Sequence, residues 1–321
     1  MIRRLWQAGM IRMARSPSVK RIMQQGSAGS ALAARYVAGA TAETAVSRAA
    51  ALHAQDGICG SLFYLGEYVD RPDLVAENFA AKLLAAEQLG RTDLDVHVSV
   101  DPTQIGYSLD PQLARRNAFA IAERVAASAG SRPGIHALML DMEDETVVEP
   151  TIALHAALVE AKLPAALTLQ AYLRRTEADL AAEIARGARV RLVKGAFAAG
   201  NDAAFTRQAE IKVNSRRLIA LMFSRSARAA GFYPIIATHD DRLQAYAIEQ
   251  AEANGWRPGD YEFEMLLGVR GDVARALARR GHRVRLYLPF GRDWWPYAIR
   301  RIGENPRNAV LLARSLLDRA A

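Results

Sequence analysis

The chain has 321 residues, of which 51% are apolar and 24% charged, and its formal net charge is +8. This length suits one (β/α)8 barrel, a fold for which about 250 residues are typical. The single cysteine, Cys59, excludes an internal disulfide and a cluster of thiolate metal ligands. Arginine is spread along the chain and no nucleic-acid-binding signature accompanies it, so we expect no nucleic-acid partner. No apolar run reaches the roughly 20 residues that cross a bilayer.

The start of the chain differs in composition from the rest. Its first 42 residues hold no Asp or Glu, but seven Lys or Arg among apolar side chains. We expect a basic helical arm over residues 1–50 and a catalytic barrel over residues 51–321. Residues 1–25 suit an amphipathic helix on a membrane surface, an organelle transit peptide or a helix that packs on the barrel. The prediction is a cytoplasmic protein, with residues 1–25 as the candidate for peripheral contact with the inner face of the membrane.

Beyond residue 57, short apolar runs alternate with alanine-rich helical stretches. This alternation predicts a parallel sheet closed into an α/β barrel of the (β/α)8, TIM-like kind. A doubly wound open sheet is the alternative, but it normally carries a glycine fingerprint after its first strand, and no G-x-G-x-x-G stands there. The eight expected strands are residues 58–65, 96–100, 137–140, 166–169, 190–193, 234–237, 261–265 and 284–288.

The last expected strand leads into the most informative segment of the chain. It passes through a turn with Pro289 and Gly291 into a predicted helix. Residues three and four apart share a helix face, so two guanidinium groups on this helix could hold a carboxylate in a fixed pose. An ordinary salt-bridged helix end is the alternative. The polar and aromatic residues in question are Tyr287, Tyr297, Arg300, Arg301 and Glu304.

This segment resembles the carboxy-terminal signature of the proline dehydrogenases, Tyr-x-Pro-x-Gly followed by Tyr-x-x-Arg-Arg-x-x-Glu-Asn. Further blocks occur in that family's order across about residues 58 to 305. They include Leu65-Gly66-Glu67, Thr103-Gln104-Ile105-Gly106, Asp141-Met142-Glu143, Gln170-Ala171-Tyr172, the run from Val190 to Ala196, Thr238-His239-Asp240 and Glu262-Phe263. The resemblance implies an enzyme that oxidises L-proline to 1-pyrroline-5-carboxylate by hydride transfer to FAD. It also implies a quinone as electron acceptor.

The resemblance assigns roles to residues at the expected strand ends. Arg300 and Arg301 would clamp the substrate carboxylate, Glu304 would hold their guanidinium groups, and Tyr287 and Tyr297 would pack against the substrate ring. From the acidic residues after the third strand it selects Asp141, as the partner of a basic residue, and we expect the others to be solvated. The expected FAD contacts are Gln170, Arg191, Lys194, Gly195, Ala196, Thr238, His239 and Glu264. No pair of histidines has metal-ligand spacing, so we expect no metal.

Four positions depart from the family's pattern. Asp101 stands where the family has a lysine that meets the substrate carboxylate, and Phe63, Phe197 and Glu264 replace other usual residues. One interpretation is a divergent proline enzyme in which Asp101 points away or pairs with a nearby arginine. Another is the same flavin chemistry on hydroxyproline, or on an amino acid or amine whose second positive group faces Asp101. A third is a flavin-binding or ligand-binding protein without turnover.

Overall fold

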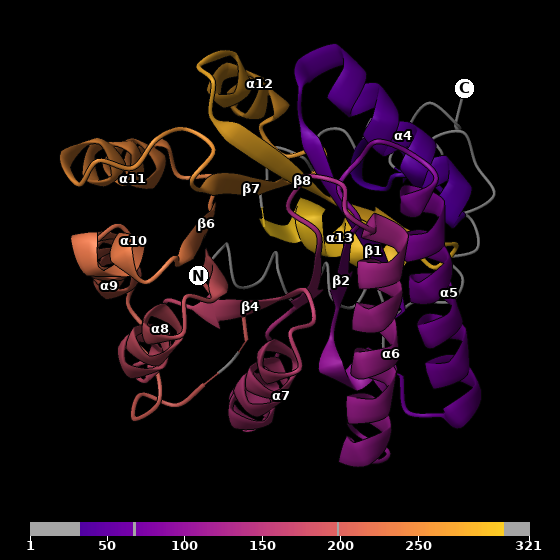
Figure 1. Cartoon of the computed structure of the whole chain (residues 1–321). Helices are drawn as coiled ribbons and strands as arrows, with labels where there is room; N and C mark the ends of the chain where they lie inside the picture. The colour runs from indigo at the N-terminus through magenta and orange to yellow at the C-terminus, as the bar shows by residue number, and fades with distance from the viewer. Residues whose placement is uncertain (1–32, 67–68, 198, 305–321) are drawn as a thin grey trace, which may run out of the picture.

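Eight parallel strands close a barrel in chain order, from β1 to β8. The computed structural model describes residues 33–66, 69–197 and 199–304. Figure 1 shows the helices placed around the ring of strands. The expected barrel is confirmed, and every expected strand overlaps an observed one. The strands are β1 (Cys59–Tyr64), β2 (His97–Val100), β3 (Ala137–Leu140), β4 (Ala165–Gln170), β5 (Arg189–Val193), β6 (Tyr233–Ala237), β7 (Glu262–Leu266) and β8 (Arg283–Phe290).

Helices follow the strands and cover the outside of the barrel. Two short 3-10 helices, η1 (Pro102–Ile105) and η2 (Glu145–Val147), lie just after β2 and β3. The helices are α4 (Ala42–Asp56), α5 (Pro72–Gly90), α6 (Pro111–Ala129), α7 (Val148–Glu160), α8 (Thr176–Ala185), α9 (Gln208–Met222), α10 (Arg225–Ala229), α11 (Asp241–Ala253), α12 (Gly271–Arg279) and α13 (Trp295–Glu304).

The sequence explains where several of these helices begin and end. Asp110 caps α6 by accepting hydrogen bonds from the backbone N–H groups of Gln112 and Leu113, and Pro111 fills the first helical position. Helix α4 begins at a capping box on Thr41 and ends at Gly57, whose φ of +67° suits glycine. Such caps help to fix the loops that connect helices and strands. Because all eight strands are parallel, their carboxyl ends lie at one rim of the barrel.

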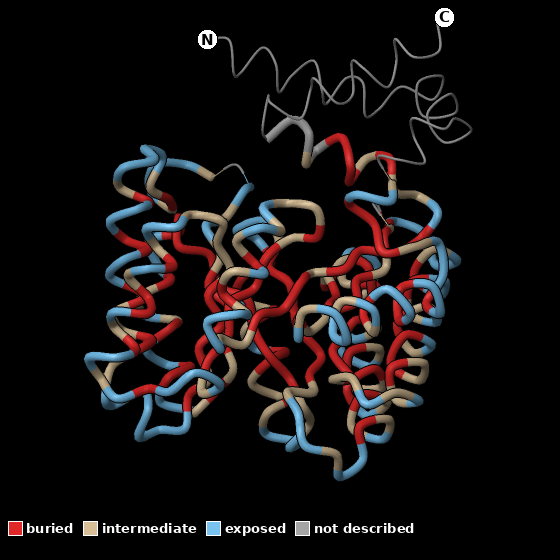
Figure 2. Tube along the Cα trace, turned by 90° about the horizontal axis from the view of Figure 1, so that it is seen from above, coloured by how far each residue is buried: buried red, intermediate tan, exposed pale blue. Residues whose placement is uncertain are grey.

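The sheet is buried on both faces, as expected for parallel strands covered by helices. All residues of β2, β3 and β4 are buried. Figure 2 shows the buried residues concentrated in the strands and on the inner sides of the helices. Part of the barrel interior is ionic, because the fully buried Arg285 donates to Glu262 at 2.7 Å and to Asp95 at 2.8 Å.

The described part of the N-terminal region packs on the barrel. Helix α4 runs without a break across residue 50, the expected end of the arm, and buries Ala42, Ala45, Val46 and Ala49. The segment expected to contact a membrane, residues 1–25, lies outside the described residues. Within the described ranges, no helix is both long and apolar enough to span a membrane.

Helix α13 lies against the end of β1. Its residues Trp295 and Ile299 share a hydrophobic cluster with Phe63 and Leu65. Tyr287 of β8 packs against the same cluster. This contact brings α13, the last helix of the described residues, to the rim where the predicted site residues lie.

Candidate active site

The guanidinium group of Arg191 is the centre of a buried polar cluster. This side chain rises from β5 and forms ion pairs with Asp141, the residue after β3, and with Glu264 of β7, the latter at 2.6 Å. Its Nε and Nη2 atoms also donate to Oγ1 of Thr168 at 3.0 and 2.8 Å. Arg191 is only 5% exposed. Because a buried charge needs partners, this arrangement fixes the guanidinium group in one pose.

Tyr287 joins the same cluster from β8. Its hydroxyl donates to Oδ2 of Asp141 at 2.7 Å, and its ring centroid lies 5.6 Å from the guanidinium carbon of Arg191. The ring also packs on Phe63, with 5.1 Å between centroids. Burial, and then the charge of Asp101, raise the pKa of Tyr287 well above its ordinary value. The phenol therefore stays neutral and acts as a hydrogen-bond donor.

Gln170 presents a buried acceptor at the end of β4. Its Nε2 donates to the carbonyl oxygens of Met142 and Glu143, at 2.9 Å each. Its Oε1 is buried and has no hydrogen-bond partner among the described residues, and the same holds for Oε2 of Glu264. Leaving a buried acceptor unpaired costs about 1–3 kcal/mol. The two oxygens therefore suit a ligand that brings N–H or O–H groups to this rim.

His239 is a neutral imidazole at the end of β6. Its Nε2 accepts a hydrogen bond from the backbone N–H of Leu266 at 3.1 Å. Burial, with Arg301 and Arg270 adding to it, lowers the pKa of His239 to about 4. At neutral pH the ring proton accordingly lies on Nδ1, which can donate. Thr238 beside it accepts from the backbone N–H of Asp240 at 3.1 Å.

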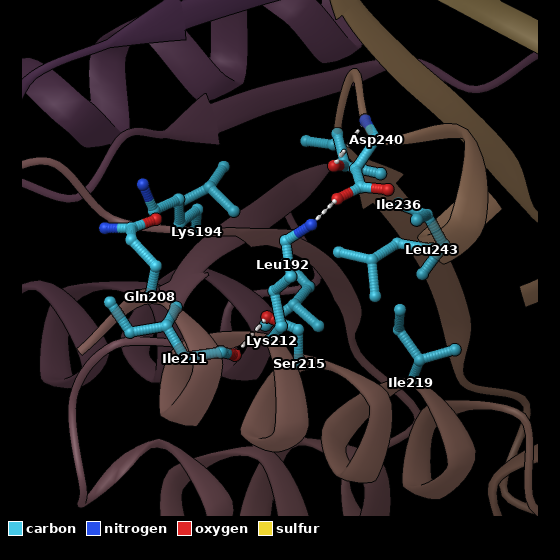
Figure 3. A pocket seen from close by; sticks show the side chains of 13 residues that line it. Leu192, Lys194, Gln208, Ile211, Lys212, Ser215, Ile219, Ile236, Asp240 and Leu243 are labelled. Atoms are coloured by element: carbon cyan, nitrogen blue, oxygen red, sulfur yellow. Dashed lines mark hydrogen bonds and ion pairs between the residues drawn. The ribbon is translucent and has the colours of Figure 1, made fainter. Parts of the chain in front are cut away.

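A cleft between β5, β6, α9 and α11 adjoins the rim. Its volume is about 80 Å³, and its wall includes Lys194 and Thr238. Figure 3 shows apolar side chains on its floor and Lys212 reaching Asp240, an ion pair of 2.6 Å. Next to it, Gly195 has φ +93°, and an added Cβ would meet the ring of Tyr172 at 2.0 Å. The backbone of this loop can thus lie this close to Tyr172 only because the residue is glycine.

Helix α13 brings part of the predicted carboxylate clamp to the rim. Tyr297 is buried, and the guanidinium carbon of Arg301 lies 5.2 Å from its ring centroid. The charge of Arg301 contributes to the lowered pKa of His239 at the end of β6. The side chains of Arg300 and Glu304 lie outside the described part of the structure. Among the described residues, no group of three His, Cys, Asp or Glu side chains could hold a metal ion.

Comparison with known proteins identifies the family of this chain. The model of a family described as proline dehydrogenase matches residues 45–314. The chain belongs to the proline dehydrogenase family. The proline dehydrogenase of Deinococcus radiodurans is 33% identical over 319 residues, which cover 99% of both chains. Proline dehydrogenase 1 of Bacillus subtilis is 31% identical over 290 residues, which cover 89% of this chain and 91% of that protein.

Solved structures share the fold at lower sequence identity. Proline utilization A from Bdellovibrio bacteriovorus, inactivated by N-propargylglycine, gives a TM-score of 0.75 at 20% identity over 86% of this chain. The match covers 33% of that longer chain. Proline utilization A from Corynebacterium freiburgense gives 0.70 at 20% identity, over 98% of this chain and 34% of its own length. These structural similarities support the barrel fold.

The expected family is confirmed, and with it an oxidoreductase that converts proline to pyrroline-5-carboxylate in proline catabolism. The family is typically flavin-dependent. Within the proline dehydrogenase barrel, the structure brings together Asp141, Arg191, Glu264 and Tyr287. It places Gln170 next to them along β4, and Lys194, Gly195, Ala196, Thr238 and His239 at the ends of β5 and β6.

Glu143 is not solvated, contrary to expectation. Its carboxylate accepts from the backbone N–H of Thr103 at 3.0 Å and from the Thr103 hydroxyl at 2.6 Å. Burial, and then the charge of Asp101, raise the pKa of Glu143 to about 7. This contact could not be predicted from the sequence, because Thr103 lies 40 residues upstream and meets Glu143 only when β2 and β3 pair.

Asp101 is half-buried, and its charge opposes the fall in the pKa of Lys82 of α5 that burial causes. The pairing of Asp101 with an arginine stays a prediction. Lys82 itself was not among the predicted site residues. Lys82 is fully buried, together with Asn78, Ala85 and Leu89 on the inner face of that helix. The signal that could have identified it is a lysine at helical spacing within an apolar stripe.

Proposed function

We propose that this chain oxidises L-proline with FAD as its cofactor, at the carboxyl ends of the barrel strands. The observation that carries the proposal is the buried cluster in which Asp141 and Glu264 hold Arg191 beside Tyr287 and the unpaired acceptor of Gln170. A fixed cation and unpaired acceptors suit an aromatic ring system that has both carbonyl and N–H edges, as a flavin has.

The cleft of Figure 3 supports a cofactor with phosphate groups, because Lys194 lies on its wall at the rim. An ammonium group binds phosphate as a point charge, and the second lysine of the cleft, Lys212, is already paired with Asp240. We infer that the Lys194-Gly195-Ala196 backbone and the Lys194 ammonium group hold the FAD pyrophosphate. The flavin ring would then meet Gln170, Arg191, Thr238, His239 and Glu264.

When bound, FAD supplies a two-electron acceptor. Oxidation of proline removes a hydride from the carbon next to nitrogen and a proton from nitrogen, leaving a C=N double bond. The chain's own task is to orient the donor carbon. Arg301, with Arg300, would hold the carboxylate, and Glu304 would hold their guanidinium groups. Tyr287 and Tyr297 would pack against the ring and keep water from it.

A quinone is our proposed electron acceptor, and residues 1–25 are our candidate for contact with the membrane in which a quinone resides. A basic amphipathic segment binds anionic surfaces more weakly as salt rises. Deleting residues 1–25 should therefore abolish any salt-sensitive binding to anionic vesicles. The same deletion should leave turnover with a water-soluble quinone in place. The barrel and the described helix α4 would remain one catalytic unit.

Oxidation of hydroxyproline or of a cationic amino acid is the second candidate function, and Asp101 is the observation that favours it. A direct test identifies the flavin released from the protein and measures pyrroline-5-carboxylate formed from L-proline with a soluble quinone. We expect the released flavin to be FAD, and we expect the turnover of L-proline to exceed that of hydroxyproline and of a cationic amino acid. FAD without turnover of any of these amines would favour a binding protein. If freshly prepared protein contained no flavin, the proposal that FAD is the cofactor would be wrong.

A further inference from the structure

Arg270 has a strained backbone at the start of α12. It is the N-cap of that helix, with φ +50° and ψ +48°, and its side chain makes no capping hydrogen bond. N-cap residues usually have an extended backbone, and the left-handed region disfavours residues that carry a Cβ. The other described non-glycine residue with positive φ is Lys162, just past the end of α7, where this conformation is common. Strain of the kind seen at Arg270 persists where surrounding contacts enforce it.

The side chain of Arg270 reaches the loop after the neighbouring strand β6. Its Nη1 forms an ion pair of 2.7 Å with Oδ1 of Asp241 and donates to the carbonyl oxygen of His239 at 3.4 Å. The two side chains of the ion pair are 42% and 60% exposed. Ion pairs with this exposure contribute little to stability. Stability alone therefore does not explain why the strained conformation is kept.

His239 is held at two points by the segment that follows β7. Its ring Nε2 accepts from the backbone N–H of Leu266, the last residue of β7, at 3.1 Å, and its carbonyl oxygen accepts from Arg270. One contact fixes the ring and the other fixes the backbone that carries it. Because Nε2 is an acceptor, the proton of the neutral ring lies on Nδ1.

The turn between these two contacts is fixed by other parts of the fold. Gly268 has φ +79°, and an added Cβ there would meet the carbonyl oxygen of Arg35. The backbone N–H of Leu267 donates to the carbonyl oxygen of Tyr287 in β8 at 3.2 Å. Arg270 therefore reaches His239 from a turn that is tied to the strand carrying Tyr287 of the candidate active site.

On the basis of FAD as the proposed cofactor, we propose that Arg270 is a positioning residue that fixes His239 for the flavin ring. Leu266 holds the imidazole, Arg270 holds the backbone, and Asp241 holds the guanidinium group of Arg270. Together they keep the Nδ1–H group in one pose, as a hydrogen-bond donor for an acceptor atom of the flavin.

Three substitutions separate the side chain of Arg270 from its backbone strain. Arg270→Gly removes both the contacts and the strain, whereas Arg270→Met removes the contacts and keeps the strain. Asp241→Asn keeps Arg270 but weakens the hold on its guanidinium group. Arg279→Met, at an exposed position of the same helix, is the matched control.

The first readout is the nitrogen NMR spectrum of the histidine rings, recorded on the full chain as purified and after removal of flavin. His239→Gln identifies the signals of His239 among those of the six histidines. We expect the proton to lie on Nδ1 in the intact chain and in Arg279→Met. In the other three variants, we expect a mixture of the two tautomers. Tm should be at least as high in Arg270→Gly as in Arg270→Met, because glycine relieves the strain.

The second readout is the affinity for FAD, measured by flavin titration of the cofactor-depleted chain. The dissociation constant should rise by about 10-fold in Arg270→Gly and Arg270→Met, as for the loss of one well-placed hydrogen bond to the cofactor. The rise should be smaller in Asp241→Asn, and Arg279→Met should match the intact chain. Tm and FAD affinity should thus differ in their order among the variants, which a merely structural role would not produce.

An Arg270→Gly chain with the His239 spectrum or the FAD affinity of the intact chain would overturn the proposal. Loss of folding in Arg270→Gly would overturn it too, because the side chain would then be needed for the fold itself. The NMR readout needs neither FAD nor proline, so it separates this proposal from the proposed function. A changed His239 spectrum in a chain that binds no FAD would keep the contact of Arg270 with His239 and reject the cofactor. Proline oxidation with an unchanged spectrum would keep the function and reject the role of Arg270.

Discussion

The hydroxyl of Tyr287 donates a 2.7 Å hydrogen bond to Oδ2 of Asp141, and the other oxygen of that carboxylate meets Arg191. One carboxylate after β3 therefore orients both an aromatic ring from β8 and a guanidinium group from β5. In a barrel, side chains from distant parts of the sequence meet in this way at the carboxyl ends of the strands. Asp141 is accordingly the residue whose loss should disturb the site most.

Asp141→Asn should lower both stability and activity. It removes one of two carboxylates that balance the buried Arg191, while Glu264 remains at 2.6 Å. Because breaking a buried ion pair costs about 3–5 kcal/mol, we expect a loss near about 3 kcal/mol in the free energy of unfolding. Turnover with L-proline should also fall strongly. Denaturant unfolding and steady-state kinetics measure the two effects. The exposed Glu145→Gln is the control, and a variant that behaves like this control would disprove the role of Asp141.

Arg301→Met should weaken substrate binding and leave the cofactor in place. Losing a charged contact to a carboxylate costs about 2–5 kcal/mol, so KM for L-proline should rise by roughly 30-fold or more. The flavin content per chain should stay unchanged, because Arg301 lies on α13 and the proposed pyrophosphate contacts lie after β5. The exposed Arg279→Met is the control. An unaltered KM in Arg301→Met would show that Arg301 does not hold the substrate carboxylate.

Lys194→Met should weaken the binding of FAD. This residue lines the cleft beside Gly195, where we place the pyrophosphate, and its replacement removes a positive charge. We expect the dissociation constant for FAD to rise by about 10-fold, as for the loss of one charge-assisted contact. Flavin titration of the cofactor-depleted protein measures this, and Lys162→Met is the matched control. Equal affinity in both variants would place the pyrophosphate elsewhere.

Asp95 should make the barrel sensitive to acid. Burial alone would raise the pKa of Asp95, but Arg285 and Arg283 lower it to about 2, against 3.8 ordinarily. Because the pKa of Asp95 is lower in the folded than in the unfolded chain, the ionised carboxylate stabilises the fold above about pH 4. This contribution of about 2 kcal/mol to the free energy of unfolding is lost as the pH falls through 2. Asp95→Asn should therefore be less stable than the intact chain at neutral pH. The difference should shrink toward pH 2. Denaturant unfolding at a series of pH values measures this difference, with the exposed Asp93→Asn as the control. A difference in stability that stays constant with pH would show that the pKa of Asp95 is not lowered.

The barrel could be predicted from the sequence because its signal is local. Short apolar runs such as residues 137–140 alternate with helical stretches, and the observed β3 has those same bounds. The family resemblance led us to expect an ion pair for Asp141, and the structure shows its partner, Arg191.

The surroundings of the site were not predictable, because they depend on contacts between distant segments. Lys82 lies on a helix, not at a strand end, and its contact with Gln104 spans 22 residues. The bond between Thr103 and Glu143 spans 40 residues, so Glu143 looked like one of several solvated acids. The pairing of β2 with β3 decides the environment of Glu143, and the contact of α5 with η1 decides that of Lys82.

The proposed function requires this rim to bind a flavin that accepts electrons from proline. Anaerobic addition of L-proline to the purified protein, followed at the oxidised flavin band at about 450 nm, tests this. We expect the band to bleach in the intact chain, and we expect Arg301→Met to need much more proline for the same bleaching. A flavin band that persists at saturating proline would show that the bound flavin does not oxidise proline.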